Sequence, residues 1–309
     1  MMSNAGSLTY GVCIPTCNAG EEWQRYLEKT RTACHGSRLL VIDSSSDDDT
    51  AHIAREAGCE LVTISRHEFD HGGTRNRALE ILDDCDVVIF MTQDAYPASA
   101  STLETLVHAF EDPIVSAAYG RQLPHDHASA VSAHTRHFNY PPDSHRASVK
   151  DIPQMGIKAA FLSNSFAAYR RQALMDIGGF PENAILSEDM VAGARLLNAG
   201  WQIAYCAESA VHHSHNYTMP QECRRYFDIG VLHAREPWIQ EMTGKAEGEG
   251  KRFIMSELRF LWHRAPLQIP SAICRNGLKY MGYRLGKMED RLPVRVKRQL
   301  SMNKGFWGR

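Results

Sequence analysis

The sequence predicts an α/β fold in which a mostly parallel, Rossmann-like sheet is flanked by helices and followed by a C-terminal helical extension. Short apolar runs alternate with amphipathic stretches over roughly the first 120 residues, a pattern typical of a parallel sheet covered on both faces. Polar clusters follow several of these runs. From Met219 onward, helical spacing of apolar residues dominates.

The individual elements follow from the spacing of apolar residues. We expect strands at Leu8–Ile14, Leu39–Asp43, Leu61–Ile64, Val87–Met91, Val115–Tyr119, Ser165–Tyr169, Gln202–Cys206 and Ser209–His212. We expect helices at Glu21–Cys34, Asp47–Ala57, Thr74–Leu82, Leu103–Phe110 and Asp189–Leu197. The polar, His-rich and Pro-containing segment from His125 to Pro153 predicts a long irregular loop over the site.

Length and charge predict one large domain with a basic appendage. The chain has 309 residues, 43% of them hydrophobic, and a formal net charge of -2. From Arg275 to the end there are ten Lys or Arg residues but only two acids. A basic amphipathic helix in this region could lie on an anionic bilayer, and packing on the main domain or on a second subunit is the alternative. Its apolar and basic positions are Ile273, Leu278, Met281, Leu285, Arg275, Lys279, Arg284 and Lys287.

The cysteines and the hydropathy pattern indicate a cytoplasmic protein that could contact a membrane peripherally. The eight cysteines include no CxxC pair, so we expect reduced and mostly buried thiols. The N-terminus has no basic region followed by an apolar one, which argues against a signal peptide. No apolar run reaches the roughly 18 residues needed to cross a bilayer.

Candidate nucleotide contacts follow the first predicted strands, since ligands of such sheets bind beyond the carboxyl ends of strands. Asp43 and the serines after it could bind a base or ribose, or could simply cap a helix. Gly72 and Gly73 would let backbone N–H groups approach an anion, and Arg75 could bridge phosphate oxygens. A plain turn with a surface arginine is the alternative.

Candidate catalytic and metal-binding residues follow later apolar runs. Asp94 comes directly after a buried strand and needs a partner such as Mg²⁺ or Mn²⁺. Glu188 and Asp189 begin a helix, where they could offset its dipole or supply a general base. The cluster at residues 212–215 contains three histidines. One His that completes an oxygen-rich site is favoured over a zinc centre, because no HExxH or Cys partner is present.

Six of these segments occur together in an order that resembles the family-two inverting glycosyltransferases of the GT-A fold. They are Ile14–Asn18, Val41–Asp43, Gly72–Asn76, Thr92–Ala95, Ser187–Asp189 and His213–His215. Each is common alone, but six in order are specific, and the resemblance covers roughly Leu8 to Gly230. Phe69–Asn76, His213–Tyr217, Tyr283–Lys287 and Leu300–Lys304 also resemble the rhamnosyltransferase branch.

The resemblance implies a role for each matching position. Pro15, Thr16 and Asn18 would hold the nucleotide, Asp43 the pyrimidine base, and Gly73 and Arg75 the diphosphate. Asp94 corresponds to the metal-binding acid of the DxD motif, which here has Gln93 and Ala95 at its other positions. Gln93 would still contact substrate. His213, or His215 in its place, would complete the metal site. Asp189 would be the catalytic base, and Glu188 would position the acceptor or stabilise the start of the helix.

The resemblance also implies an activity and a domain organisation. Residues 1–225 would form the GT-A nucleotide-sugar-binding and catalytic domain, and residues 226–309 a C-terminal helical region with a basic amphipathic tail. The enzyme would transfer L-rhamnose from dTDP-β-L-rhamnose, with Mg²⁺ or Mn²⁺, to a glycan acceptor such as a lipid-linked O-antigen or other polysaccharide precursor. It would bind no nucleic acid.

Four other functions share part of this pattern. A sugar nucleotidyltransferase should carry its glycine-rich loop after the first strand, where this chain has Pro15-Thr16-Cys17 instead. A dinucleotide oxidoreductase lacks its GxGxxG motif for the same reason. A non-catalytic nucleotide-sugar-binding protein would not need Asp189, and a zinc hydrolase would be built on His212, His213 and His215.

Overall fold

Strand β4 (Val87–Met91) lies at the centre of a nine-stranded mixed sheet, with every residue buried in the computed structural model. The structure describes residues 8–244 and 247–308. The sheet order is β3-β2-β1-β4-β8-β6-β9-β5, and β7 also pairs with β9. The other strands are β1 Tyr10–Thr16, β2 Arg38–Asp43, β3 Glu60–Thr63, β5 Tyr96–Pro97, β6 Val115–Leu123, β7 His145–Ala147, β8 Phe166–Arg170 and β9 Gln202–His212.

The strand directions decide where the polar strand ends meet. Strands β1 to β4 pair in parallel, as predicted, and β6 and β9 are parallel to each other. Strand β8 runs antiparallel to both β4 and β6. The carboxyl ends of β1, β2, β4, β6 and β9 therefore lie at one edge of the sheet, together with the start of β8.

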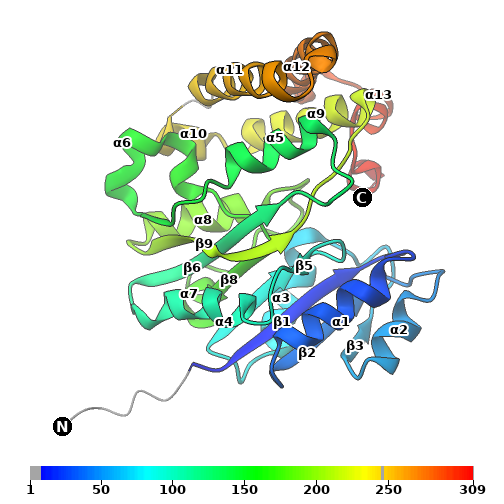
Figure 1. The fold of residues 1–309 in the computed structure, drawn as a ribbon, viewed down its shortest axis with the longest axis vertical. Coiled ribbons are helices and arrows are strands. Elements are labelled where there is room, and N and C mark those ends of the chain that lie inside the picture. The colour runs from blue at the N-terminus through cyan, green and yellow to red at the C-terminus, as the bar shows by residue number, and fades with distance from the viewer. Residues whose placement is uncertain (1–7, 245–246, 309) are drawn as a thin grey trace.

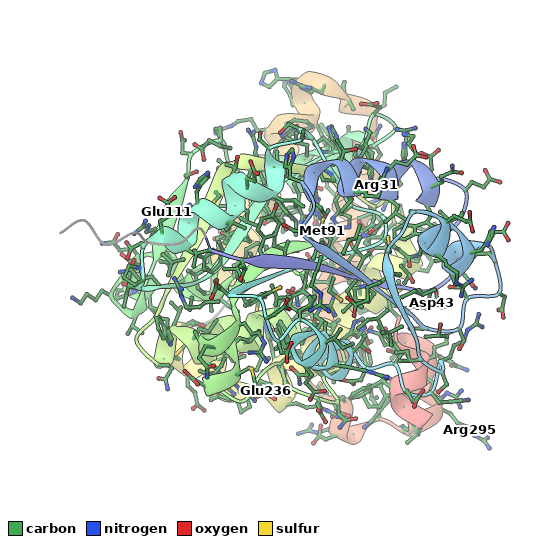
Figure 2. All side chains as sticks on the ribbon, turned by 90° about the horizontal axis from the view of Figure 1, so that it is seen from below. Arg31, Asp43, Met91, Glu111, Glu236 and Arg295 are labelled. Carbon is green, nitrogen blue, oxygen red and sulfur yellow. The ribbon has the colours of Figure 1, made fainter. Side chains whose placement is uncertain are left out.

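Helices cover both faces of the sheet (Figure 1). One face packs against α1 Trp23–Ala33, α2 Thr50–Glu56 and α4 Thr102–Val107. The other packs mainly against α3 His71–Ile81, α7 Arg171–Asp176, α8 Glu188–Asn198 and α9 Met219–Arg235. The remaining helices are α5 Ala130–Asn139, α6 Ile152–Met155, α10 Pro237–Thr243, α11 Glu247–Arg264, α12 Ile269–Gly286 and α13 Val294–Leu300. Figure 2 shows Met91 deep among the side chains and Arg295 at the periphery.

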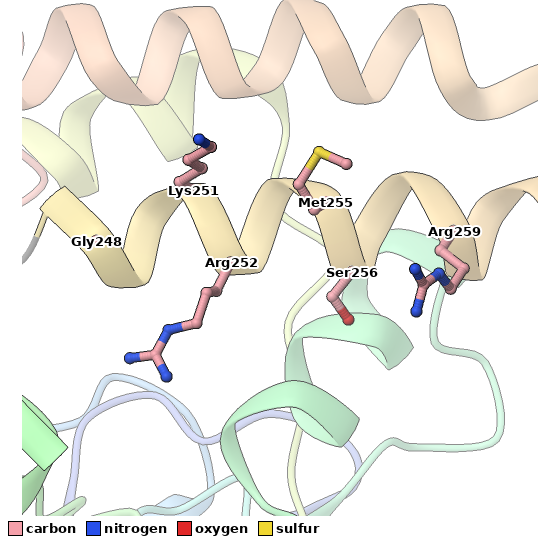
Figure 3. Close-up of a pocket in the computed structure, with 6 residues that line it drawn as sticks. All are labelled: Gly248, Lys251, Arg252, Met255, Ser256 and Arg259. Carbon is pink, nitrogen blue, oxygen red and sulfur yellow. The ribbon is translucent and has the colours of Figure 1, made fainter. Parts of the chain in front are cut away.

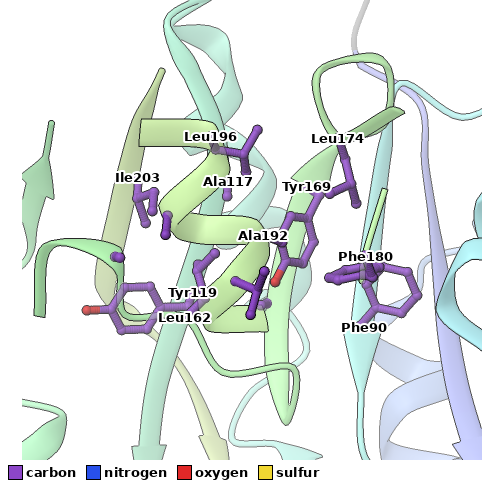
Figure 4. Close-up of a cluster of buried hydrophobic side chains, with 14 of the residues drawn as sticks. Phe90, Ala117, Tyr119, Leu162, Tyr169, Leu174, Phe180, Ala192, Leu196 and Ile203 are labelled. Atoms are coloured by element: carbon purple, nitrogen blue, oxygen red, sulfur yellow. The ribbon is translucent and has the colours of Figure 1, made fainter. Parts of the chain in front are cut away.

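Three aromatic rings pack between the sheet and the helices on the face that α8 covers. Phe90 on β4, Tyr169 on β8 and Phe180 meet edge to face, with centroids 5.1 to 5.9 Å apart. Figure 4 shows this cluster beside α8. Edge-to-face contacts of this kind add to the stabilisation from burial alone. The cluster also fixes Tyr169, whose hydroxyl supports the site.

The loop predicted from His125 to Pro153 is wrong, because the segment contains helix α5, strand β7 and helix α6. Ser129 caps α5 by accepting a hydrogen bond from the backbone N–H of Ser132. His134 of α5 is buried against Phe253 and Phe260 of α11. The residues that complete the core of α5 thus lie more than 100 positions away, so its own sequence looked polar.

Two other predictions need adjustment. The two short strands predicted between Gln202 and His212 form the single strand β9, whose pairing with β6 shifts register after Gly120. Helix α9 runs without interruption through the predicted boundary between residues 225 and 226. None of the described helices combines the length and apolar character needed to cross a bilayer.

Helices α9 and α12 cross at close range through glycines. A Cβ atom on Gly286 would lie 2.0 Å from the carbonyl oxygen of Phe227, and one on Gly282 would lie 2.2 Å from that of Cys223. Gly230 of α9 faces Gly286 in the same crossing. Any side chain at these positions would therefore push the two helices apart.

We predict that Gly286→Ala destabilises the protein by about 1–3 kcal/mol, because the added methyl group overpacks a backbone contact. Gly277→Ala is the matched control in α12, since nothing lies within 4 Å of its Cβ position. The control should gain about 0.5–1 kcal/mol from helix propensity. Urea unfolding followed by circular dichroism measures both changes. Equal effects of the two substitutions would contradict the close crossing.

Candidate active site

The loops after β1 and β2 are held together by the carboxylate of Asp43. Its Oδ1 accepts hydrogen bonds from Thr16 Oγ1 (3.0 Å) and Ser46 Oγ (2.6 Å), and its Oδ2 accepts one from the Ser46 backbone N–H (2.9 Å). Asp43 and Thr16 are both buried. The structure therefore brings these two predicted nucleotide-binding residues together and gives Asp43 a role in shaping the loop.

Gln93, just after β4, forms hydrogen bonds with the loop that follows β1. The backbone N–H of Cys17 donates to Gln93 Oε1 (2.8 Å), and Gln93 Nε2 donates to the Cys17 carbonyl (3.2 Å). Next to it, Asn18 has a positive φ of 48° and accepts the Asp47 backbone N–H at its Oδ1 (2.8 Å). Pro15 is the penultimate residue of β1. Gln93 at the first DxD position thus binds the protein's own main chain.

The glycines at the start of α3 do not present open N–H groups, contrary to the prediction for Gly73. Asp70 caps the helix, and its Oδ1 accepts the backbone N–H groups of Gly72 (3.1 Å) and Gly73 (2.8 Å). Gly72 is needed for packing, since a Cβ there would lie 1.9 Å from the carbonyl oxygen of Pro181. The anion at this helix start is therefore a side chain of the protein.

Arg75 forms a buried ion pair with Glu188, and its predicted open position facing phosphate is not observed. Its Nη1 lies 3.0 Å from Glu188 Oε1 and also donates to the His71 carbonyl at 2.9 Å. Both residues are only 4% exposed. Burial raises the pKa of Glu188, but the charge of Arg75 outweighs this and the net pKa is lowered. Glu188 is therefore ionised, and Arg75 neutralises it.

Asp189 is held by two backbone N–H groups beside this pair. The Asn164 backbone N–H donates to its Oδ2 (2.9 Å), and the Met190 N–H donates to its Oδ1 (2.8 Å). Burial, followed by the charge of Glu188, raises the pKa of Asp189 to about 7. A carboxylate with this pKa suits a general base that works near neutral pH.

Asn164 is a functional candidate that the sequence analysis missed. Besides holding Asp189, its Nδ2 donates to Glu188 Oε1 (2.9 Å), and its Oδ1 accepts the hydroxyl of Tyr169 (2.8 Å). The side chain is 2% exposed. Asn164 lies in a short polar stretch before β8, where nothing in the sequence distinguishes it from an ordinary turn residue.

Asp94, His213 and His215 form a cluster that could hold a metal ion. Their ligand atoms lie within 4.8 Å of one another, and this is the metal-compatible group found among the described residues. Asp94 Oδ2 lies 3.4 Å from His213 Nε2 and 3.5 Å from His215 Nδ1. One carboxylate and two imidazoles suit a divalent transition metal. The structure thus brings both candidate histidines to Asp94.

The protonation states around Asp94 also suit a metal. Burial raises the pKa of Asp94, but its hydrogen bond with His213 and the neighbouring imidazoles outweigh this, so its net pKa is lowered. Burial and the charge of His213 lower the pKa of His215 to about 4. His215 is therefore neutral near pH 7 and can offer a lone pair. His212 has no place in the cluster, since its Nδ1 lies 3.3 Å from the Pro124 carbonyl.

Gln122, the second residue missed in the sequence, connects the metal cluster to the candidate base. Its Oε1 lies 2.8 Å from His213 Nδ1, and its Nε2 donates to Ser163 Oγ at 2.9 Å. Since Oε1 can only accept, His213 must carry a proton on Nδ1, so Nε2, which faces Asp94, is the nitrogen that would bind a metal. Arg136 donates to the same Oε1. Ser163 precedes Asn164, so one short chain of contacts joins His213 to Asp189.

Comparison with known proteins identifies the family of the chain. Residues 11–178 match the model of glycosyl transferase family 2. The chain is 47% identical to an O-antigen chain rhamnosyltransferase of Salmonella anatum over 303 residues, covering 97% of this chain and 96% of that protein. It is 46% identical to an O-antigen chain rhamnosyltransferase of Salmonella typhimurium, covering 95% of this chain and 94% of that protein.

Solved structures share the fold at low sequence identity. A mannosyltransferase from Pyrobaculum calidifontis, solved with GDP-Man and Mn²⁺, aligns with a TM-score of 0.57 at 18% identity, over 98% of this chain and 86% of that one. S. aureus TarS with UDP-GlcNAc aligns with a TM-score of 0.56 at 15% identity, over 92% of each chain. The predicted fold class is confirmed, and the chain belongs to glycosyltransferase family 2, whose GT-A fold it adopts.

Proposed function

We propose that this glycosyltransferase transfers L-rhamnose from dTDP-β-L-rhamnose to a lipid-linked glycan acceptor, with inversion at the anomeric carbon, at the inner face of the cytoplasmic membrane. Nearly full-length identity of 46–47% to two O-antigen chain rhamnosyltransferases supports the sugar and the acceptor class. The position of Asp189 carries the chemistry, because a half-buried carboxylate with a raised pKa is joined to the metal-compatible cluster by the contacts of Asn164, Ser163 and Gln122.

In the proposed reaction, the acceptor hydroxyl oxygen attacks the anomeric carbon of rhamnose as the bond from that carbon to the diphosphate oxygen breaks. Asp189 takes the hydroxyl proton. Each of its oxygens accepts one N–H bond, which leaves lone pairs for the acceptor. A single displacement on a β-L donor gives an α-L-rhamnoside and releases dTDP, so no covalent enzyme intermediate is needed.

The remaining side chains hold these groups in place. Asn164 and Arg75 fix Glu188 and, through it, the start of α8 that carries Asp189. Asp43, Thr16 and Gln93 shape the loop proposed to receive the thymine and deoxyribose of the donor. Mn²⁺ or Mg²⁺ held by Asp94, His213 and His215 would neutralise charge on the departing diphosphate. Imidazole ligands favour Mn²⁺ over Mg²⁺.

The donor assignment predicts that dTDP-β-L-rhamnose is turned over in preference to UDP-glucose or GDP-mannose. The assay measures nucleoside diphosphate release with a rhamnose-accepting glycan and Mn²⁺, and NMR of the product should give the α anomer. Asp189→Asn should lower transfer by about 10²–10⁴-fold with little change in dTDP binding. Asp83→Asn is the control, because Asp83 is an exposed acid that lies far from Asp189 in the sequence. Preferred use of another nucleotide sugar would refute the rhamnose assignment.

The pH dependence of transfer should report Asp189. Because a base must be deprotonated to accept a proton, kcat/KM should fall about tenfold per pH unit below about pH 7. Glu188→Gln removes the charge that raises the pKa of Asp189, so this acidic limb should shift to lower pH. Glu182→Gln in the preceding exposed loop is the matched control and should leave it unchanged. An unshifted limb in Glu188→Gln would exclude Asp189 as its source.

Gln122 should set the affinity of the metal cluster. Gln122→Met removes the acceptor for His213 Nδ1–H and should weaken Mn²⁺ binding by about 10–100-fold in calorimetry. Gln122→Glu keeps an acceptor at that position and should retain most of the affinity. The exposed Gln24→Met is the control. Chelation by EDTA should abolish transfer, and added Mn²⁺ should restore it. Unchanged affinity in Gln122→Met would show that this contact does not orient the ligand.

A further inference from the structure

Helices α11 and α12 and the turn between them carry most of the exposed large apolar side chains. Of the thirteen such side chains among the described residues, eight lie between residues 254 and 288. They are Ile254, Met255, Trp262, Leu267, Ile273, Tyr280, Met281 and Met288. A concentration of this kind on one helix pair marks an interaction surface more often than chance exposure. We refer to these residues, with the cations among them, as the α11–α12 face.

The most exposed residues lie at the connection between the two helices. Trp262 at the end of α11 is 69% exposed, Leu267 in the connecting turn is 95% exposed, and Ile273 early in α12 is 58% exposed. Figure 1 shows this helix pair at one end of the molecule, with α5, α9 and α10 between it and the sheet. The inner side of the pair is already packed, because Leu261 and Ala272 are buried against Val131 of α5.

The charges of this face are almost all positive. Between residues 250 and 288 the only acid is Glu257, which is 1% exposed. The exposed cations are Lys251, Arg252, Arg259, Arg264 and Arg284, and Arg252 is paired with Glu249 near the start of α11. Figure 3 shows Lys251, Arg252 and Arg259 around a hollow of about 350 Å³ on α11.

The structure also corrects which predicted cations face outward. Arg275 and Lys279, expected on the basic side of an amphipathic helix, point inward and pair with Glu222 at 3.0 and 3.6 Å. Arg284 remains exposed, beside Tyr280 and Met281. The outward side of α12 is therefore more apolar than its sequence predicts.

This combination fits an anionic bilayer better than a second copy of the chain. A symmetric dimer through the same face would oppose its own exposed cations. A bilayer with anionic headgroups supplies the opposite charge, and its interface is where Trp and Tyr side chains are enriched. An acidic protein partner would match the positive charge of the face. It would not account for the exposed apolar turn between the two helices, where Leu267 is almost fully exposed.

We propose that the α11–α12 face binds an anionic phospholipid bilayer, with Trp262, Leu267 and Ile273 entering the headgroup region and Lys251, Arg259, Arg264 and Arg284 contacting lipid phosphates. The proposal rests on the proposed function for the lipid-linked acceptor that such contact would serve. Arg275 of α12 donates to the Tyr217 carbonyl (2.8 Å), and the Tyr217 ring stacks on His215 at 4.8 Å. The membrane-binding helix is thus joined directly to the metal cluster.

Co-sedimentation of the full chain with vesicles tests the proposal. The protein should bind vesicles of phosphatidylglycerol and phosphatidylethanolamine, should not bind phosphatidylcholine vesicles, and should dissociate as salt is raised. Trp262→Ser combined with Leu267→Ser, and separately Arg259→Glu combined with Arg264→Glu, should each weaken binding by at least about tenfold. Met175→Ser removes an equally apolar, 42% exposed side chain elsewhere and is the matched control.

Three results would overturn the proposal: no binding to anionic vesicles, equal binding to phosphatidylcholine, or variants that bind as well as the wild-type chain. Light scattering that shows a dimer dissociated by Trp262→Ser would instead assign the face to self-association. Binding of dTDP with Mn²⁺ should be unchanged in these variants, which shows that they are folded. A chain that turns over dTDP-rhamnose but ignores vesicles refutes only this inference, and the reverse result refutes only the proposed function.

Discussion

The site depends on keeping two adjacent acids, Glu188 and Asp189, at the buried start of α8. An unpaired buried carboxylate costs several kcal/mol, and removal of one partner from a buried pair typically costs about 3–5 kcal/mol. Glu188 is paired with Arg75 and accepts a hydrogen bond from Asn164, while Asp189 accepts hydrogen bonds from backbone N–H groups. The two acids consequently differ, since Glu188 is ionised and Asp189 has a raised pKa.

A second constraint joins this acidic pair to the metal cluster. Gln122 on β6 is 1% exposed and uses its amide oxygen for His213 and its amide nitrogen for Ser163. Gln122 therefore links His213 to the stretch before β8, from which the Asn164 backbone N–H holds Asp189.

The C-terminal region contacts α9 and the loop that precedes α8. The backbone N–H of Met302 donates to Asp228 Oδ2 on α9 (2.9 Å), and Asn303 Nδ2 donates to the Ile185 carbonyl (2.7 Å) just before α8. Burial raises the pKa of Asp228 to about 6. The tail thus ties α9 to the loop that leads into Glu188. Residues outside the matched range 11–178 thus contribute to the support of the site.

The sequence by itself determined the parallel half of the sheet and the polar strand ends, and its resemblance to family-two glycosyltransferases singled out Asp94, His213 and Asp189. These follow from periodicity and from the order of motifs, which are local properties of the chain. Only the tertiary structure decided that Asn164 and Gln122 organise the site and that Arg75 faces Glu188. It also decided that α5 is a helix. The reason is that a hydrogen bond between residues 25 to 113 positions apart, such as Asn164–Asp189 or Gln122–His213, leaves no periodic trace in either segment.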